Sequence, residues 1–139
     1  MSAESMIELF ATVLRADGWD GEVDEAGGNL HAIFSAEGMQ VPLWIHVDSQ
    51  NQLAVCLCRL PQVVPEAKRA LLLETIARVN FGLQIGTFEL NVDSGELRFR
   101  ASSLLADAAP TPGLASGLVG ATIFLFRRYF PALLGVLYG

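Results

Sequence analysis

The spacing of apolar residues predicts a helix at the start of the chain. Apolar side chains recur at three- and four-residue spacing over Ser2–Ala16. They are Met6, Leu9, Phe10, Val13 and Leu14. Asp17 and Gly18 follow and end the pattern. The segment therefore predicts an amphipathic first helix.

Alternating apolar and polar positions predict four strands after this helix. The candidates are Glu22–Ala26, Leu30–Ala36, Val41–Asp48 and Leu53–Leu60. In the third, Leu43 lies on the apolar side and Trp44 on the opposite side, which is typical of a sheet with one solvated face. The fourth is apolar on both sides, which predicts that it is covered on both faces or covered by a partner.

A second helix is predicted from Pro65 to Val79. Proline suits the first helical position because it has no backbone N–H to leave unpaired. The apolar side of this helix carries Leu72, Ile76 and Val79. Asn80 is well suited to the left-handed conformation that ends a helix, and Gly82 relaxes the chain beyond it.

A β-hairpin is predicted to follow the second helix. Its strands are Gly86–Leu90 and Glu96–Arg100, joined by a turn at Asp93–Gly95. Glu89 is then expected beside Arg98 or Arg100 as a cross-strand charge pair. The glycines here follow a helix and precede a strand, which is the reverse of the order in phosphate-binding loops. A phosphate site is therefore not expected.

A last helix is predicted from Gly113 to about Phe130, and it is apolar nearly all round. Such a helix is buried on more than one side. Its uncharged part, Leu114–Phe126, is shorter than the roughly 20 residues that span a bilayer. Extending it would bring in Arg127, Arg128 and the break at Pro131, so no membrane insertion is expected.

Composition predicts one acidic domain over residues 1–139. The chain has 52% hydrophobic residues and a net charge of −6. Nucleic acid is an unfavourable partner because phosphate binding needs clustered Lys and Arg. Surplus apolar residues in a chain this small favour a subunit interface, so we expect a homodimer. The two cysteines lie too close together to form a disulfide scaffold, which favours the cytoplasm.

Few residues suggest chemistry. Cys56 and Cys58 could hold a metal, but no third ligand has suitable spacing, and core packing is favoured. His31 and His46 could act as bases, but neither lies in a motif, so structural roles are favoured. The acidic stretch Asp17–Glu25 lacks the pattern of a calcium loop. No catalytic residue, metal or cofactor is expected.

Several segments resemble the YbjN family of bacterial proteins. They are Ala77–Leu83, Gly86–Leu90, Gly95–Arg100 and Arg128–Gly139. The matching residues, expected to build the fold, are Asn80, Phe81, Gly82, Gly86, Phe88 and Pro131. The resemblance implies an α+β fold with an antiparallel sheet in the order α-β-β-β-α-β-β-α, similar to class I type III secretion chaperones. Those chaperones are small acidic homodimers that bind extended segments of partner proteins, and the family, described as a sensory transduction regulator, has no established enzymatic activity.

The function expected from the sequence is a non-enzymatic protein-binding, regulatory or chaperone-like module. An exposed apolar groove of the sheet and first helix would use Leu9, Phe10, Leu43 and Trp44, although Trp44 could instead pack under a helix. The alternative is a ligand-sensing domain with a pocket between the sheet and the last helix. That pocket would be lined by Cys58, Phe124 and Phe126. A third hypothesis is a hydrolase or metal enzyme using His31, His46 and the acidic stretch.

Overall fold

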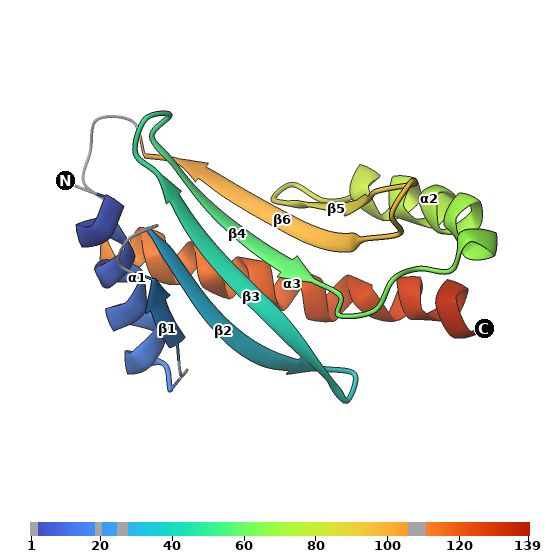
Figure 1. Ribbon diagram of the computed structural model, residues 1–139, viewed down its shortest axis with the longest axis horizontal. Coiled ribbons are helices and arrows are strands. Elements are labelled where there is room, and N and C mark those ends of the chain that lie inside the picture. Colours follow the sequence, from blue (N-terminus) through green and yellow to red (C-terminus); the bar gives the residue numbers. More distant parts are fainter. Residues whose placement is uncertain (1–2, 19–20, 25–27, 106–110) are drawn as a thin grey trace.

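The computed structural model describes residues 3–18, 21–24, 28–105 and 111–139 (Figure 1). The helices are α1 (Ala3–Ala16), α2 (Glu66–Phe81) and α3 (Pro112–Tyr138). The strands are β1 (Gly21–Asp24), β2 (Asn29–Ala36), β3 (Met39–Asp48), β4 (Leu53–Arg59), β5 (Thr87–Leu90) and β6 (Leu97–Leu104). Helices at the start, middle and end of the chain, as predicted, are therefore confirmed.

The strands form one antiparallel sheet in the order β1-β2-β3-β4-β6-β5. β1 to β4 follow one another as neighbours, and the chain then leaves the sheet to form α2. It returns as a hairpin whose second strand, β6, pairs with β4 and leaves β5 at the edge. The predicted α+β class and α-β-β-β-α-β-β-α order are confirmed, and the short β1 extends the sheet at its other edge.

The helices cover one face of the sheet. α3 passes behind the sheet in Figure 1 and contacts β4 and β6, while α1 packs against β1, β2 and β3. α2 packs against β5 and α3. The side chains beneath these helices are fully or almost fully buried, and the large ones include Leu30, Phe34, Leu43, Ile45, Phe88, Leu97 and Phe99. The alternate residues of the same strands point to the other face, over which no helix of the described chain lies.

The last helix fills the middle of the core. Phe126 and Phe130 are completely buried, and α3 contacts α1 and α2 as well as the sheet. Its apolar sides are therefore largely covered within the chain, which accounts for a helix without a fully polar face. α3 is long and apolar enough to cross a membrane, by length and composition alone, and here it lies along the sheet.

α3 is longer than the sequence predicts. It continues past Phe130 to Tyr138, with Pro131 inside it. An internal proline removes a backbone hydrogen bond and costs roughly 3 kcal/mol. Packing holds the helix beyond this point, because Leu133 is completely buried and the Lys68 ammonium of α2 donates to the Val136 carbonyl at 3.1 Å. The predicted end near Phe130 is therefore wrong.

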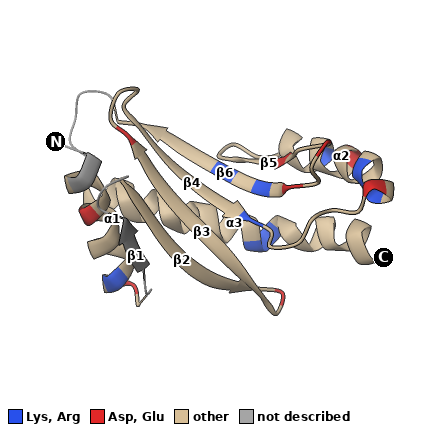
Figure 2. Ribbon diagram, viewed as in Figure 1, with Lys and Arg blue, Asp and Glu red and all other residues tan. Residues whose placement is uncertain are grey.

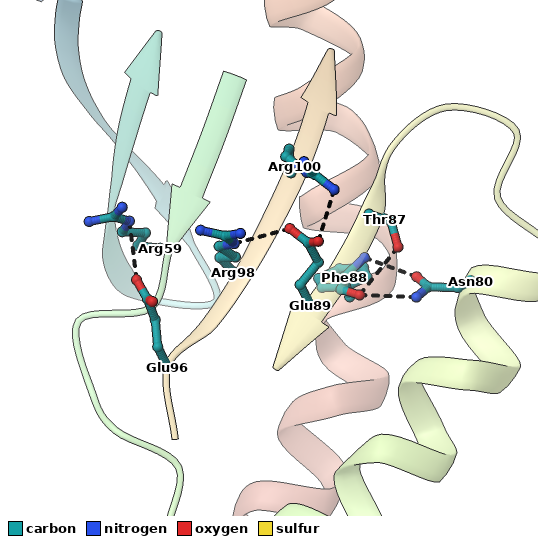
Figure 3. Close-up of polar contacts among 8 residues, drawn as sticks. All are labelled: Arg59, Asn80, Thr87, Phe88, Glu89, Glu96, Arg98 and Arg100. Carbon is teal, nitrogen blue, oxygen red and sulfur yellow. Dashed lines mark hydrogen bonds and ion pairs between the residues drawn. The ribbon is translucent and has the colours of Figure 1, made fainter. Parts of the chain in front are cut away.

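Asn80 joins the end of α2 to strand β5. The prediction of a left-handed Asn80 is wrong, because Asn80 lies within α2 and is not among the described residues with positive φ. Its Nδ2 donates to the Phe88 carbonyl at 3.0 Å, and its Oδ1 accepts from the Phe88 N–H at 2.9 Å (Figure 3). The amide thus pairs with Phe88 as a neighbouring strand would, and it occupies the outer edge of β5 at that residue.

Two features require glycine at position 86, a close contact with a side chain and the backbone conformation. Its φ is +80°, a region that favours glycine. A Cβ at this position would lie 2.5 Å from Cζ of Phe99, which is buried in the core. Gly38, in the turn between β2 and β3, has a similar φ of +75°, but a Cβ there would meet only open space.

We predict that Gly86→Ala lowers the free energy of unfolding more than Gly38→Ala does. The shared left-handed conformation costs about 1–2 kcal/mol in each variant. Overpacking against Phe99 adds about 1–3 kcal/mol in Gly86→Ala alone. Urea denaturation followed by circular dichroism measures both values, and equal losses in the two variants would contradict the contact with Phe99.

Candidate functional site

One face of the sheet, called the open face below, is not covered by any of the described helices. In Figure 1 it is turned toward the viewer, with α3 behind it. Strand register brings its residues into rows, and one row joins His31, Trp44, Leu57 and Arg100 across β2, β3, β4 and β6. Residues from strands distant in the sequence therefore share one continuous surface.

An apolar strip occupies the middle of the open face. We define it as Ile33, Trp44, Val55 and Leu57. Ile33 is 58% exposed and Trp44 is 39% exposed, while Val55 and Leu57 are partly buried. A solvated sheet face normally carries polar side chains at such positions. Exposing the apolar strip to water is therefore unfavourable in free energy.

Trp44 is held in place by polar neighbours. The His31 ring meets it edge-on, with 3.6 Å between ring centroids. On the β4 side, the Arg59 guanidinium carbon lies 5.7 Å from the centroid of the indole ring, within range for a cation–π contact. The indole therefore presents a fixed surface, and the alternative in which Trp44 packs under a helix is wrong.

Three arginines border the apolar strip. Arg59, Arg98 and Arg100 form this arginine cluster (Figure 3). Glu89 accepts from Arg98 Nε at 3.0 Å and from Arg100 Nη2 at 2.9 Å. Glu96 pairs with Arg59 Nε at 3.2 Å. The predicted pairing of Glu89 with Arg98 or Arg100 is confirmed, and it involves both arginines.

The arginine cluster has the opposite charge balance to the whole chain. Its three arginines face two glutamates, whereas the chain carries a net charge of −6. Figure 2 shows two basic positions along β6, which are Arg98 and Arg100 of the cluster. The open face therefore combines an apolar centre with a locally positive border.

The four residues expected to line a groove do not lie together. Phe10 is completely buried and Leu43 is 1% exposed, because α1 packs on the covered face of the sheet. Leu9 is partly buried on α1, and Trp44 lies on the other side of the sheet. The expected groove is corrected accordingly: the side of the sheet that meets α1 is core, and Trp44 alone of the four reaches the open face.

The residues expected to line a ligand pocket are also separated. Cys58 and Phe126 are completely buried in the core between the sheet and α3, while Phe124 points outward and is 62% exposed. Phe124 instead borders an open hollow of about 590 Å³ that is lined by α3, including Val119 and Ile123, and by Asp17 just after α1. The three predicted residues therefore do not enclose one cavity.

The cysteines and histidines have structural surroundings. Cys56 and Cys58 are free thiols in the core, and burial raises the pKa of Cys56 to about 12 and that of Cys58 still further above its ordinary value. His46 Nδ1 shares a 2.7 Å hydrogen bond with Asn29 Oδ1, and His31 packs on Trp44. Among the described residues, no three His, Cys, Asp or Glu side chains are grouped to hold a metal. Most of the acidic stretch Asp17–Glu25 lies outside the residues whose side chains are described.

A family model matches almost the whole chain. It is YbjN, with the description "Putative bacterial sensory transduction regulator", and it matches residues 7–135. The chain belongs to the YbjN family. The crystal structure of YbjN from E. coli is similar over 88% of this chain and 86% of that chain, with a TM-score of 0.62 and 12% identity. No curated protein matches the sequence.

Two solved complexes contain chains with the same fold as this YbjN-family chain. One is the ExsC–ExsE complex, with a TM-score of 0.58, 13% identity, and coverage of 89% of this chain and 92% of that chain. The other is the HopA1–SchA chaperone–effector complex, with a TM-score of 0.58, 11% identity, and coverage of 93% and 97%. At such identities the likeness shows the fold alone, which is similar to that of type III secretion chaperones.

The arginine cluster was only partly visible in the sequence of this YbjN-family chain. The alternation Arg98-x-Arg100 with Glu89 on the preceding strand predicts one ion pair. Arg59 gives no such signal, because its position opposite Arg98 depends on β4 pairing with β6. That pairing skips over α2 and β5, so adjacency in the sequence does not indicate it.

We predict that neither cysteine of the native protein reacts with a disulfide reagent at about pH 8, where an ordinary exposed thiol begins to ionise. Burial disfavours the thiolate and excludes the reagent at both sites. Release of thionitrobenzoate measures the reaction. Both thiols are expected to react once denaturant unfolds the chain, and rapid reaction of the native protein would contradict this structural role.

Proposed function

We propose that this chain is a non-enzymatic protein-binding module, regulatory or chaperone-like, and that its open face binds a segment of a partner protein. The observation that carries the proposal is the uncovered apolar strip, with Trp44 at its centre. Contiguous apolar surface on a folded domain marks sites of interaction. The ExsC–ExsE and HopA1–SchA complexes support the proposal by analogy of fold.

The contacts of the reactive side chains support a non-enzymatic role. The Cys56 and Cys58 thiols are buried in the core, and the two described histidines are engaged with Trp44 and Asn29. A nucleophile needs a base within hydrogen-bond reach and access to substrate. Buried thiols far from solvent meet neither condition, which favours binding over catalysis. We propose a soluble, cytoplasmic location and no nucleic-acid partner, on the acidic composition.

A homodimer would be formed most simply through α2. Leu71 is 56% exposed, Leu73 is 39% exposed, and Phe81 at the end of the helix is 95% exposed. The neighbouring strand edge is less available, because Asn80 already occupies the backbone groups of Phe88. We therefore propose that side chains of α2, rather than pairing between β5 strands, join two copies. This assigns the open face to the partner protein.

We predict that Phe81→Ser converts a dimer into a monomer. The substitution removes the most exposed aromatic side chain of α2 and changes no buried contact. Size exclusion with light scattering should give twice the 15.0 kDa chain mass for the wild type and the single mass for the variant. Phe124→Ser, at a 62% exposed position on α3, is the matched control and should remain a dimer. A wild-type protein of the single mass would contradict the dimer.

We predict that Trp44→Ser abolishes recovery of a partner protein from native lysate of the source organism. The indole is an exposed aromatic side chain at the centre of the apolar strip, and losing such an anchor typically costs about 2 kcal/mol or more in binding. Affinity capture with quantitative mass spectrometry compares wild type, Trp44→Ser and Phe124→Ser. One stoichiometric protein should be recovered with the first and third baits only. Equal recovery with Trp44→Ser, or loss with Phe124→Ser alone, would contradict the assignment to the open face.

A further inference from the structure

Two arginines of the open face lie directly opposite each other on neighbouring strands. The β4–β6 register pairs Arg59 with Arg98, and Arg100 follows two residues later on the same side of β6. Like charges in directly opposite positions destabilise a sheet, since their Cβ atoms lie only about 5 Å apart. The arrangement departs from what sheet stability alone favours, and such departures are typical of functional surfaces.

The glutamates use only part of the hydrogen-bonding capacity of these arginines. Each guanidinium has five N–H donors. Glu96 forms an ion pair with Arg59, with 3.2 Å to Nε, and Glu89 accepts hydrogen bonds from Nε of Arg98 and Nη2 of Arg100. The terminal amino groups of Arg59 and Arg98 have no acceptor among the described residues. The three side chains are 45%, 33% and 45% exposed, in sequence order. Unused donors of this kind suit a carboxylate, which a guanidinium can bind through two parallel hydrogen bonds.

The unused donors adjoin the apolar strip. Arg59 lies over the Trp44 ring, and Arg100 is the direct cross-strand neighbour of Leu57. If the arginines hold the carboxylate of an acidic residue, the next residue of the bound segment lies beside an apolar surface. A segment with an acidic residue next to a large apolar residue matches both parts at once.

We propose that the open face recognises a protein segment in which Asp or Glu adjoins a large aliphatic or aromatic residue. The carboxylate pairs with the arginine cluster, and the apolar side chain packs on Trp44 and Leu57. This inference rests on the proposed protein-binding function and specifies the chemistry of the partner. The positive border also favours encounter with such a segment, because the rest of the chain is acidic and repels it elsewhere.

A protein carboxylate fits the cluster better than a nucleic-acid backbone. Binding along a phosphate backbone requires a row of cations with little nearby negative charge. Here the two glutamates lie among the three arginines, and the next surface is apolar. One or two carboxylates can be accommodated beside Glu89 and Glu96, whereas a row of phosphates would meet them repeatedly.

The test is selection from a random dodecapeptide display library on the immobilised full-length protein. Enriched peptides are then synthesised with a fluorescent label, and their Kd is measured by polarisation. The variants are the double substitution Arg59→Gln/Arg98→Gln and the matched control Arg78→Gln, which removes an exposed arginine paired with Glu74 on α2. Thermal melts establish that each variant is folded, and Arg98→Lys keeps the charge but loses the paired donors.

We expect enriched peptides to carry Asp or Glu next to a large apolar residue. The double substitution should weaken their binding by about tenfold or more, since charge-assisted hydrogen bonds are lost, whereas Arg78→Gln should leave it unchanged. Apolar peptides without acidic preference, bound equally by the double variant, would overturn the inference while supporting the proposed function. Absence of any enrichment, tighter binding of a single-stranded oligonucleotide, or a wild-type dimer that Trp44→Ser dissociates would also overturn it. The lysate experiment tests the proposed function independently: that function is contradicted if Trp44→Ser leaves partner capture intact.

Discussion

The packing of α3 against one face of the sheet is the interaction on which the rest of the structure depends. Phe126 and Phe130 stack with 4.6 Å between ring centroids, and Phe126 also meets Phe34 of β2 and Phe88 of β5. One helix thereby contacts strands from both halves of the sheet, β2 toward one edge and β5 at the other. α1 and α2 pack against this same helix, so all three helices lie on one face of the sheet. None of the three described helices covers the apolar side chains of the other face, which leaves them available to another molecule.

Periodicity in the sequence predicts most elements of this fold, because each face of a helix or strand leaves its own repeat. It also predicts that Leu53–Leu60 needs cover on both sides, and β4 faces α3 on one side and the open face on the other. Contacts between distant residues could not be predicted in this way. The path of α3 beyond Pro131 depends on α2, and the conformation of Asn80 depends on Phe88 eight residues later. For the same reason, Phe10 and Leu43 were predicted as contact residues: only the topology shows which apolar face α1 covers.

Family membership indicates the kind of domain, whereas the open face indicates which residues would bind a partner. The YbjN match and the similar chaperone fold establish what kind of domain this is, but at 11–13% identity they transfer no binding residue. The surface residues of this chain supply that detail. A fixed indole, an apolar strand and an incompletely paired arginine cluster occupy one continuous surface, while Cys56 and Cys58 are buried in the core and His31 and His46 contact Trp44 and Asn29. Together they favour recognition of a partner segment over catalysis.

Site-specific photo-crosslinking in cells of the source organism tests the central claim most directly. A benzoylphenylalanine residue would replace Ile33, which lies beside Trp44 on the open face, or, in a second strain, Phe124 of α3, and mass spectrometry would locate the joined peptides. The account predicts that the probe at position 33 joins a defined segment of another protein and that the probe at position 124 does not. Crosslinks from position 124 alone, or from position 33 only to a second copy of this chain, would contradict it.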